Sequence, residues 1–180
     1  MVYVMLGTGF EEIEALAPVD LLRRAGVEVL TVGINGKTVF GGHGIGVQAD
    51  ILIDEMDLTA MEMIVLPGGL GGVASIRASK ETLDAVRFAW ENGCFVAAIC
   101  AGPTVLADLG ITDGRKATCY PGQKGNMGDK ALLEDSAAVR DGKLITGASA
   151  GCAVEFALML VDALKGPETA KTIRDQIVIR

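Results

Sequence analysis

Short apolar runs rich in β-branched residues recur along the chain, and polar segments with helical periodicity separate them. Runs of this length, bounded by glycine and polar residues, are typical of strands buried on both faces of a sheet. The runs that predict strands are residues 2–6, 27–32, 63–66, 95–99 and 144–146. The segments that predict helices are residues 11–25, 79–92, 103–109, 151–165 and 168–175.

The alternation of strand and helix predicts an α/β protein with a mostly parallel sheet that helices cover on both sides. Residues 37–50 differ, because they are rich in glycine and have β-forming flanks, which predicts a hairpin projecting from the sheet. No repeat, linker or low-complexity tract divides the 180 residues. We therefore expect a single domain over residues 1–180.

Within the helical segment 11–25, Glu14 lies on the apolar face, beside Phe10, Ala17 and Leu21. A carboxyl group that points into a core must be protonated or paired, and burial raises its pKa. A neutral Glu14 would be able to donate a hydrogen bond to a thiolate. The alternative is that the side chain reaches the surface. Glu11 and Glu12 turn away from this face, and we expect both to lie closer to water.

Composition narrows the classes of partner. The chain has 16 Lys and Arg against 23 Asp and Glu, a formal net charge of −7, and no long basic run. Nucleic acids and anionic membranes attract cationic surfaces, so neither is an expected partner. The chain has no long apolar span, and MVYVML at its start does not resemble a secretory leader, which predicts a cytoplasmic protein.

The cysteine and histidine content argues against a metal centre. Four cysteines without a CxxC pair predict free thiols, and with His43 as the single histidine we expect no metal site. Cys94 and Cys152 are interpreted as structural. Cys119, at a strand end before Tyr120, is a candidate resolving thiol for Cys100.

Cys100 stands where an apolar strand meets a helix. It ends the strand of residues 95–99 and is followed by Ala101, Gly102 and Pro103, and proline is favoured at the first position of a helix. Such a sharp turn is typical of a nucleophile elbow. The positive end of the helix dipole and free N–H groups favour a thiolate there, so we expect a lowered pKa. The alternative is a buried structural cysteine.

The segment Pro67-Gly68-Gly69 follows the strand of residues 63–66 and offers backbone N–H groups at the same sheet edge. Glycine permits close approach of a ligand, so the N–H groups of Gly68, Gly69 and Ala101 are candidates for binding a developing oxyanion. A plain tight turn explains the glycines equally well. Residues 69–74 match G-x-G-x-x-A, but no acidic residue follows at a strand end at the required spacing, which disfavours dinucleotide binding.

Four motifs in this order, GFEEIEALAPVDLLRRAG, IVLPGG, VAAICAGP and VEFALMLVDAL, resemble the ThiJ/PfpI superfamily over nearly the whole chain. They are most similar to the branch of the parkinsonism-associated protein deglycase and cysteine redox sensor. The resemblance implies a flavodoxin-like three-layer sandwich of the class I glutamine amidotransferase type, and a homodimer. It also implies a reactive Cys100 hydrogen-bonded to a protonated Glu14, with N–H groups of Gly69 and Ala101 lining the pocket.

The sequence departs from the family pattern at three places. Tyr120 stands in the segment where relatives place a histidine near the nucleophile, and a phenol is a poor base at neutral pH. Ala101 stands where the protease-like branch has histidine, which disfavours peptidase activity. Ala148 stands where relatives have an arginine near the pocket, which weakens anion binding there.

His43 belongs to a loop that, in the family, reaches toward the pocket of the second subunit. We therefore expect His43 of one subunit to approach Cys100 of the other, and the alternative is an exposed loop histidine. Tyr120, Cys119 and His43 are thus auxiliary candidates.

Three functions compete at this point. The first is cofactor-independent glyoxalase-like or deglycase-like chemistry, in which a Cys100 thiolate adds to a small reactive carbonyl compound and Glu14 moves the proton. The second is an oxidative-stress sensor or chaperone-like protein that uses oxidation of Cys100 by a small oxidant. The third, an amidotransferase-like or thiamine-pathway role, rests on fold relatives alone. Carbonyl chemistry is the function we favour.

Overall fold

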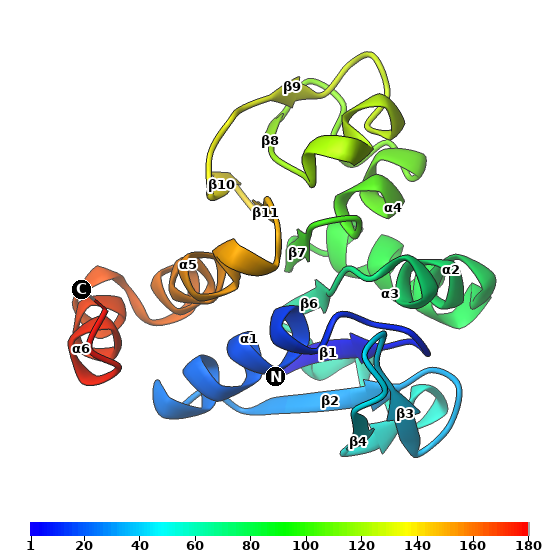
Figure 1. Cartoon of the computed structure of the whole chain (residues 1–180), viewed down its shortest axis with the longest axis horizontal. Coiled ribbons are helices and arrows are strands. Elements are labelled where there is room, and N and C mark those ends of the chain that lie inside the picture. Colours follow the sequence, from blue (N-terminus) through cyan, green and yellow to red (C-terminus); the bar gives the residue numbers. More distant parts are fainter. Residues whose placement is uncertain (180) are drawn as a thin grey trace.

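A seven-stranded sheet forms the centre of the protein, in a computed structural model that describes residues 1–179 (Figure 1). Its strands, in spatial order, are β5 (Ile51–Leu52), β2 (Val29–Gly33), β1 (Val2–Leu6), β6 (Met63–Leu66), β7 (Phe95–Ile99), β11 (Leu144–Gly147) and β10 (Ala138–Asp141). Neighbouring strands are parallel except β10 and β11, which are antiparallel. The order β2-β1-β6-β7-β11 is that of a flavodoxin-like fold. The predicted α/β class is confirmed.

Helices cover both faces of the sheet, which gives three layers (Figure 1). Alternate strand residues supply the two cores: Val2 and Val4 of β1 face one side, and Tyr3 and Met5 face the other. The side of Val2 holds α1 (Glu12–Arg24), α5 (Ala153–Lys165) and α6 (Pro167–Gln176). The side of Tyr3 holds α2 (Leu70–Ala78), α3 (Lys80–Glu91) and α4 (Pro103–Asp108). Because strands contribute to both cores, their sequences are apolar throughout.

Helix α2 is an element that the apolar pattern did not predict. It begins immediately after Gly69, whose φ of 83° is in the left-handed region that glycine tolerates best. Two glycines in its first turn weaken the helical signal. Gly72 has a packing reason, since a Cβ atom there would lie 2.7 Å from Cα of Phe10. The glycines thus let α2 pack directly against the segment that follows β1.

The glycine-rich segment forms the predicted hairpin. Strands β3 (Thr38–Phe40) and β4 (Gly46–Gln48) pair antiparallel in a small sheet of their own. The hairpin is attached to the segment after β1 by two backbone hydrogen bonds, from Gly9 N–H to the Phe40 carbonyl and from Gly42 N–H to the Phe10 carbonyl, both of 2.8 Å. The connecting loop therefore lies against the start of α1.

Several short elements were also not predicted. They are η1 (Ile53–Glu55), η2 (Leu58–Ala60), η3 (Pro121–Asn126), β9 (Leu132–Leu133) and η4 (Ala150–Cys152). The strand end expected before Tyr120 corresponds to β8 (Lys116–Ala117), which ends two residues before Cys119. Two-residue strands and single 3₁₀ turns carry too little periodicity to be read from sequence. Strands β5 and β10 at the two edges of the large sheet were missed as well. The predicted helix over residues 151–165 begins two residues later, after η4.

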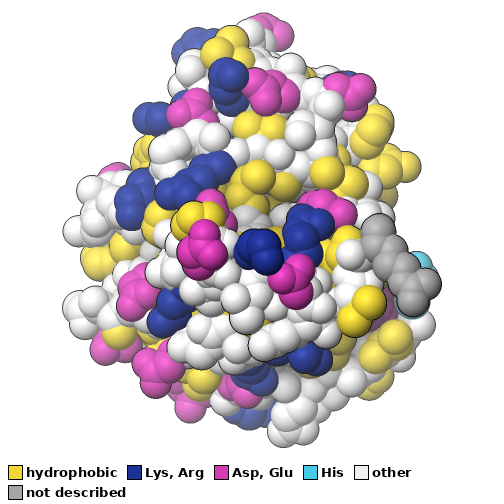
Figure 2. Space-filling view, turned by 90° about the vertical axis from the view of Figure 1, so that its left-hand side faces the viewer, with side chains coloured by type: hydrophobic (Ala, Val, Ile, Leu, Met, Phe, Trp, Pro, Cys, Tyr) yellow, Lys and Arg dark blue, Asp and Glu magenta, His cyan; other side chains and the backbone are white. Residues whose placement is uncertain are grey.

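No helix among the described residues is long and apolar enough to cross a membrane. Acidic and basic side chains are intermixed on the face drawn in Figure 2. An intermixed surface of this kind gives no extended field of one sign on that face.

Candidate active site

The turn between β7 and α4 holds Cys100 in a strained conformation. Its φ of 65° is in the left-handed region, which non-glycine residues rarely adopt. Gly102 completes the turn, because a Cβ atom there would lie 2.6 Å from the Leu66 carbonyl oxygen. The peptide N–H of Cys100 donates to the Gly147 carbonyl (2.9 Å), and its own carbonyl accepts from Tyr120 N–H (2.9 Å). The predicted strand–turn–helix elbow is confirmed.

Glu14 lies on the first turns of α1 and is fully buried, as its place on the apolar face predicts. Its Oε2 accepts a hydrogen bond of 2.9 Å from Gly68 N–H. Its Oε1 is buried and has no partner of regular hydrogen-bond geometry among the described residues. The Cys100 thiol nevertheless lies close enough for hydrogen bonding to affect the pKa of both groups. A buried carboxyl group thus faces the thiol.

Burial raises the pKa of Glu14 to about 7. The negative charge of Glu11 also raises this pKa, whereas the hydrogen bonds from Cys100 and Gly68 lower it. The expectation of a raised pKa is confirmed. A value near neutrality suits a group that both accepts and returns protons.

Burial raises the pKa of the Cys100 thiol to about 12, and the charge and hydrogen bonding of Glu14 add to this effect. The N–H groups of Ala101 and Gly69 act in the opposite direction and are outweighed. The prediction of a lowered thiol pKa is therefore wrong. The prediction took Glu14 as a neutral hydrogen-bond donor and relied on the helix N-terminus. It did not include burial of the sulfur, which is the largest cause of the shift, or the negative charge of an ionised Glu14, which disfavours a second negative charge.

The glycines after β6 have two separate tasks. Gly68 N–H binds Glu14, so it is not available to a ligand oxygen, which corrects its expected place in the oxyanion-binding set. Gly68 also allows the close packing, because a Cβ atom there would lie 2.5 Å from Oε2 of Glu14 and 2.8 Å from Cβ of Cys100. The N–H groups of Gly69 and Ala101 act on the Cys100 sulfur and remain candidates for oxyanion binding.

A pocket of about 240 Å³ opens over the thiol, at the carboxyl ends of the parallel strands. Its lining residues are Glu11, Gly69, Leu70, Cys100, Ala101, Tyr120 and Gln123. Ligands of flavodoxin-like proteins bind at this edge of the sheet, next to the point where the strand order reverses. A larger groove of about 560 Å³ lies between α5 and α6, but it contains neither Cys100 nor Glu14.

Of the auxiliary candidates, Tyr120 lines the pocket and Cys119 does not. Tyr120 is half exposed. Cys119 is buried, its thiol faces the Tyr120 carbonyl (3.4 Å), and burial raises its pKa. This arrangement gives no support to Cys119 as a resolving thiol.

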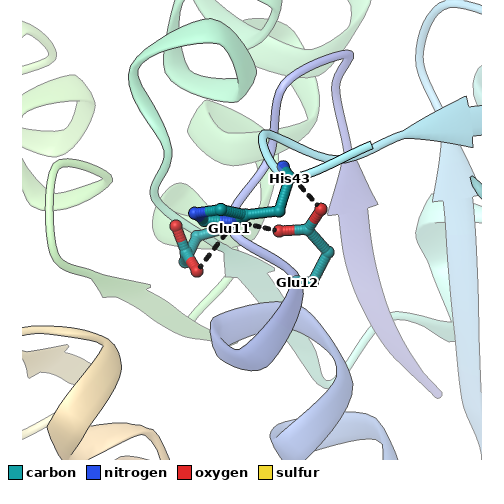
Figure 3. Close-up of side chains that lie close together, drawn as sticks. All are labelled: Glu11, Glu12 and His43. Atoms are coloured by element: carbon teal, nitrogen blue, oxygen red, sulfur yellow. Dashed lines mark hydrogen bonds and ion pairs between the residues drawn. The ribbon is translucent and has the colours of Figure 1, made fainter. Parts of the chain in front are cut away.

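His43 lies on the hairpin loop and binds the start of α1 in its own chain (Figure 3). Its Nδ1 lies 2.8 Å from Oε2 of Glu12 and 3.6 Å from Oε1 of Glu11. The peptide N–H of His43 donates to Oε1 of Glu12 (2.8 Å). The hydrogen bond to Glu12 raises the pKa of His43, and the charges of Glu11 and Glu12 add to the shift.

Glu12 is buried, which contradicts the expectation that it lies near water. Burial alone would raise its pKa, but the hydrogen bonds from His43 and neighbouring N–H groups outweigh that effect and lower the pKa to about 2. The loop accommodates the carboxylate because residue 41 is glycine, and a Cβ atom there would lie 2.3 Å from Glu12. The sequence signal that could have predicted burial of Glu12 was the glycine-rich loop together with the acidic start of the helix.

The donor atoms of Glu11, Glu12 and His43 lie within 4.8 Å of one another, a spacing that could hold a metal ion. His43 already bonds to Glu12, so the carboxylate has a partner without a metal. The position at the N-terminus of α1 also disfavours a cation. We interpret the cluster as a salt bridge.

Comparison with known proteins agrees with this geometry. The DJ-1/PfpI family matches residues 1–163. The chain belongs to the DJ-1/PfpI family. It is 35% identical to protein dj-1beta of Drosophila melanogaster over 98% of this chain and 95% of that protein. It is 33% identical to the Parkinson disease protein 7 homolog of Danio rerio, covering 98% and 96% of the two chains. The DJ-1 branch is thereby shown.

Solved structures agree at the level of the fold. The crystal structure of Drosophila DJ-1beta superposes with a TM-score of 0.94 at 34% identity, over 99% of this chain and 97% of that one. An oxidized structure of Toxoplasma gondii DJ-1 gives 0.93 at 33% identity, over 98% and 97%. A Caenorhabditis elegans relative that is 32% identical, over 91% of this chain and 87% of its own, is named a glutathione-independent glyoxalase.

Sequence reasoning missed four residues of the site. Leu70 and Gln123 belong to α2 and η3, elements that were not predicted, and no local signal marks them as pocket residues. Glu11 was considered only as an acid near the helix start, yet it forms one wall of the pocket. Glu12 was missed as the anchor of the hairpin loop.

Proposed function

We propose that the protein acts on small reactive carbonyl compounds through Cys100 and Glu14, in a glyoxalase-like or deglycase-like reaction. The observation that carries the proposal is a buried carboxyl group with a pKa of about 7 that faces a thiol on a strained elbow. A nucleophile within hydrogen-bonding reach of a base is the arrangement that covalent catalysis requires. The glyoxalase name of the Caenorhabditis elegans relative supports the same class of substrate.

In this mechanism Glu14 is a base first and an acid afterwards. The Cys100 sulfur attacks the aldehyde carbon of a 2-oxoaldehyde while its proton passes to the Glu14 carboxylate. The N–H groups of Gly69 and Ala101 bind the oxygen that becomes negative. Glu14 returns the thiol proton to this oxygen, which gives a hemithioacetal and an ionised Glu14. Glu14 then takes the proton from the first carbon and delivers it to the second carbon, while the hydroxyl proton of the first carbon passes to the second oxygen, which leaves a 2-hydroxy thioester on Cys100. Water hydrolyses the thioester to a hydroxy acid and restores the thiol, so no cofactor is consumed.

Turnover of methylglyoxal tests this proposal. We expect Cys100→Ser and Glu14→Gln to lower kcat/KM by about 10²–10⁴-fold, the usual contribution of a nucleophile or proton-transfer group. The matched control is Cys152→Ser, which changes a cysteine outside the pocket. The wild-type rate should rise with pH through about 7, as Glu14 loses its proton. Equal rates in the wild type and Cys100→Ser would refute the proposal.

Oxidation sensing is the second candidate. The N–H groups of Gly69 and Ala101 approach the sulfur and suit a sulfinate, whose oxygens accept hydrogen bonds. The Toxoplasma gondii relative has been solved in an oxidized form. Against it, the raised thiol pKa disfavours the thiolate that peroxide attacks. If Cys100 gains two oxygen atoms under limiting peroxide before Cys94 and Cys152 do, by peptide mass spectrometry, sensing becomes the better interpretation.

Further properties follow from the family. We propose a homodimer, with small molecules as the other partners and no nucleic acid or membrane. Exposed apolar side chains on α1 and the hairpin, Ile13, Leu16, Phe40 and Ile45, support a contact surface there. Four free cysteines suit the reducing cytoplasm. The approach of His43 to the second subunit remains a prediction, and its bond to Glu12 within its own chain already accounts for its position.

A further inference from the structure

The pocket over Cys100 has an acidic wall. Glu11 lines it, and Glu14 lies buried beneath the sulfur. The lining contains no lysine or arginine among the residues that the structure describes. Lys124 follows Gln123 in η3, and its charge acts on Cys119. A ligand in the pocket therefore meets negative charge from Glu11 without a balancing cation in the lining.

Two contacts hold Glu11 at this wall, one through its backbone and one through its side chain. Its peptide N–H donates to the Gly68 carbonyl (3.0 Å), which fixes the start of α1 against the glycines of the pocket. Its carboxylate lies 3.6 Å from Nδ1 of His43, a ring that Glu12 orients by a bond of 2.8 Å (Figure 3). Glu11 is only 24% exposed, so its charge is less screened by water than that of a free surface side chain.

We propose that Glu11 is a specificity-determining residue that keeps anionic ligands away from Cys100, and that the charge of the His43 ring sets how strongly Glu11 does so. The inference deepens the proposed function, on which it rests: the substrates are uncharged carbonyl compounds such as 2-oxoaldehydes, and 2-oxo acids are excluded. Repulsion of a carboxylate by a charge a few ångströms away in a half-buried pocket corresponds to about a fivefold preference.

Few titratable groups surround Glu11 and His43. Glu11 and Glu12 face His43 from the start of α1, and Glu11 acts in turn on Glu14. Tyr120 and Cys100 face the pocket from the segments after α4 and β7. Protonated His43 offsets part of the Glu11 charge, so exclusion of anions should be strongest above the pKa of His43, which is raised.

Two alkylating reagents of nearly equal shape test the charge directly. Iodoacetamide is neutral and iodoacetate is anionic, and both alkylate the same sulfur, so the ratio of their rates cancels the reactivity of the thiol. We would measure this ratio at Cys100 by peptide mass spectrometry at about pH 8.5, where Glu14 is ionised. Cys94 and Cys152 report the intrinsic ratio of the reagents.

We expect Glu11→Gln to lower the iodoacetamide-to-iodoacetate ratio at Cys100 by about fivefold. The matched control Glu168→Gln, an exposed acid of α6, should leave it unchanged. The wild-type ratio should fall as salt is added, because salt screens charge but not shape. A ratio that Glu11→Gln leaves unchanged, or that the control alters equally, overturns the proposal.

Both His43 and Glu14 change charge as pH varies, so the effect of His43 is measured in a variant in which Glu14 no longer titrates. In a Glu14→Gln background at about pH 6, His43→Gln should raise the ratio, because the positive partner of Glu11 is lost. At a pH high enough to deprotonate the His43 ring, the substitution should have a smaller effect. An equal effect at both pH values would indicate a purely structural His43 and would overturn this part.

Glyoxal and glyoxylate, a neutral and an anionic aldehyde of similar size, extend the test to carbonyl compounds. Protection of Cys100 from iodoacetamide should favour glyoxal in the wild type, and Glu11→Gln should reduce that preference. If neither aldehyde protects Cys100, the proposed carbonyl function fails, whereas the alkylation ratio still decides the role of Glu11.

Discussion

Cys100 and Glu14 act as one titrating unit rather than as two independent groups. The carboxyl group loses its proton near pH 7, while the thiol keeps its own up to about pH 12. Because the two groups interact, these two steps belong to the pair, and between them the sulfur and the carboxyl group share one proton. In the proposed reaction, this proton transfers within the pair as sulfur bonds to carbon. This differs from the permanently ionised thiol that the helix N-terminus alone suggests.

The raised pKa of Glu14 predicts how stability varies with pH. The folded state keeps the Glu14 proton up to about pH 7, whereas the unfolded chain releases it near the ordinary value of 4.5. The folded state therefore binds more protons between these values, and its stability falls as pH rises through that window. Glu14→Gln has no proton to lose. We expect its free energy of unfolding, relative to wild type, to increase by up to about 3 kcal/mol from pH 4.5 to pH 7.5.

Urea unfolding in a series of buffers measures this difference. Glu168→Gln serves as a control, because this exposed side chain has no comparable environment and should give a difference that is flat with pH. If the difference in unfolding free energy between Glu14→Gln and the wild type also did not change with pH, burial would not raise the pKa of Glu14, and this prediction would be wrong.

At the scale of elements, close backbone contacts around the segment after β1 assemble the site. Helix α2 packs against Phe10 through Gly72, and the hairpin loop encloses the Glu12 carboxylate. Both contacts approach the residues just before α1, and α1 carries Glu14. The glycines at these points are therefore packing requirements, although glycine normally weakens a helix.

This interpretation predicts a reversal of the usual effect of Gly→Ala in a helix. Alanine at an unobstructed helix position stabilises by up to about 1 kcal/mol. Gly72→Ala should instead destabilise by about 1–3 kcal/mol, because the new methyl group would lie 2.7 Å from Cα of Phe10. Gly125→Ala is the control, since nothing lies within 4 Å of a Cβ atom there. Thermal unfolding distinguishes them, and a higher Tm for Gly72→Ala would contradict the packing argument.

For the molecule as a whole, the pocket is built where three strand ends meet and is bordered by a partly apolar surface. Ile13 and Leu16 are 50% and 36% exposed on α1, and Phe40 and Ile45 are 56% and 55% exposed on the hairpin. Large exposed apolar side chains that gather in one patch are typical of protein contact surfaces. The proposed homodimer would place that contact beside the Cys100 pocket, since Glu12 and His43 connect α1 to the hairpin.

A charge placed on this surface should prevent dimerisation. We expect Ile13→Asp to be monomeric in sedimentation experiments at micromolar concentration, because a carboxylate in an apolar contact is not solvated. Val178→Asp is the control, as Val178 is 65% exposed near the other end of the chain. A monomeric wild type, or a dimeric Ile13→Asp, would contradict the proposed contact.

Local patterns determined much of this protein. Periodicity and the positions of glycine and proline, which act over a few residues, predict strands β1, β2, β6, β7 and β11, the hairpin, and helices α1, α3, α4, α5 and α6. The same local information placed Cys100 on its elbow and turned Glu14 toward the core. The family resemblance could be drawn from four motifs because each motif is one such local unit.

Only the tertiary structure decided what these residues do to one another. Gly68 binds Glu14 across 54 positions of sequence, Glu12 and His43 are 31 apart, and the sign of the Cys100 pKa shift depends on that same carboxyl group. Burial and charge interactions sum over neighbours in space, whatever their separation along the chain. Helix α2 likewise packs against the segment after β1 through Gly71 and Gly72, which lie against Gly9 and Phe10, a contact that no helical period encodes.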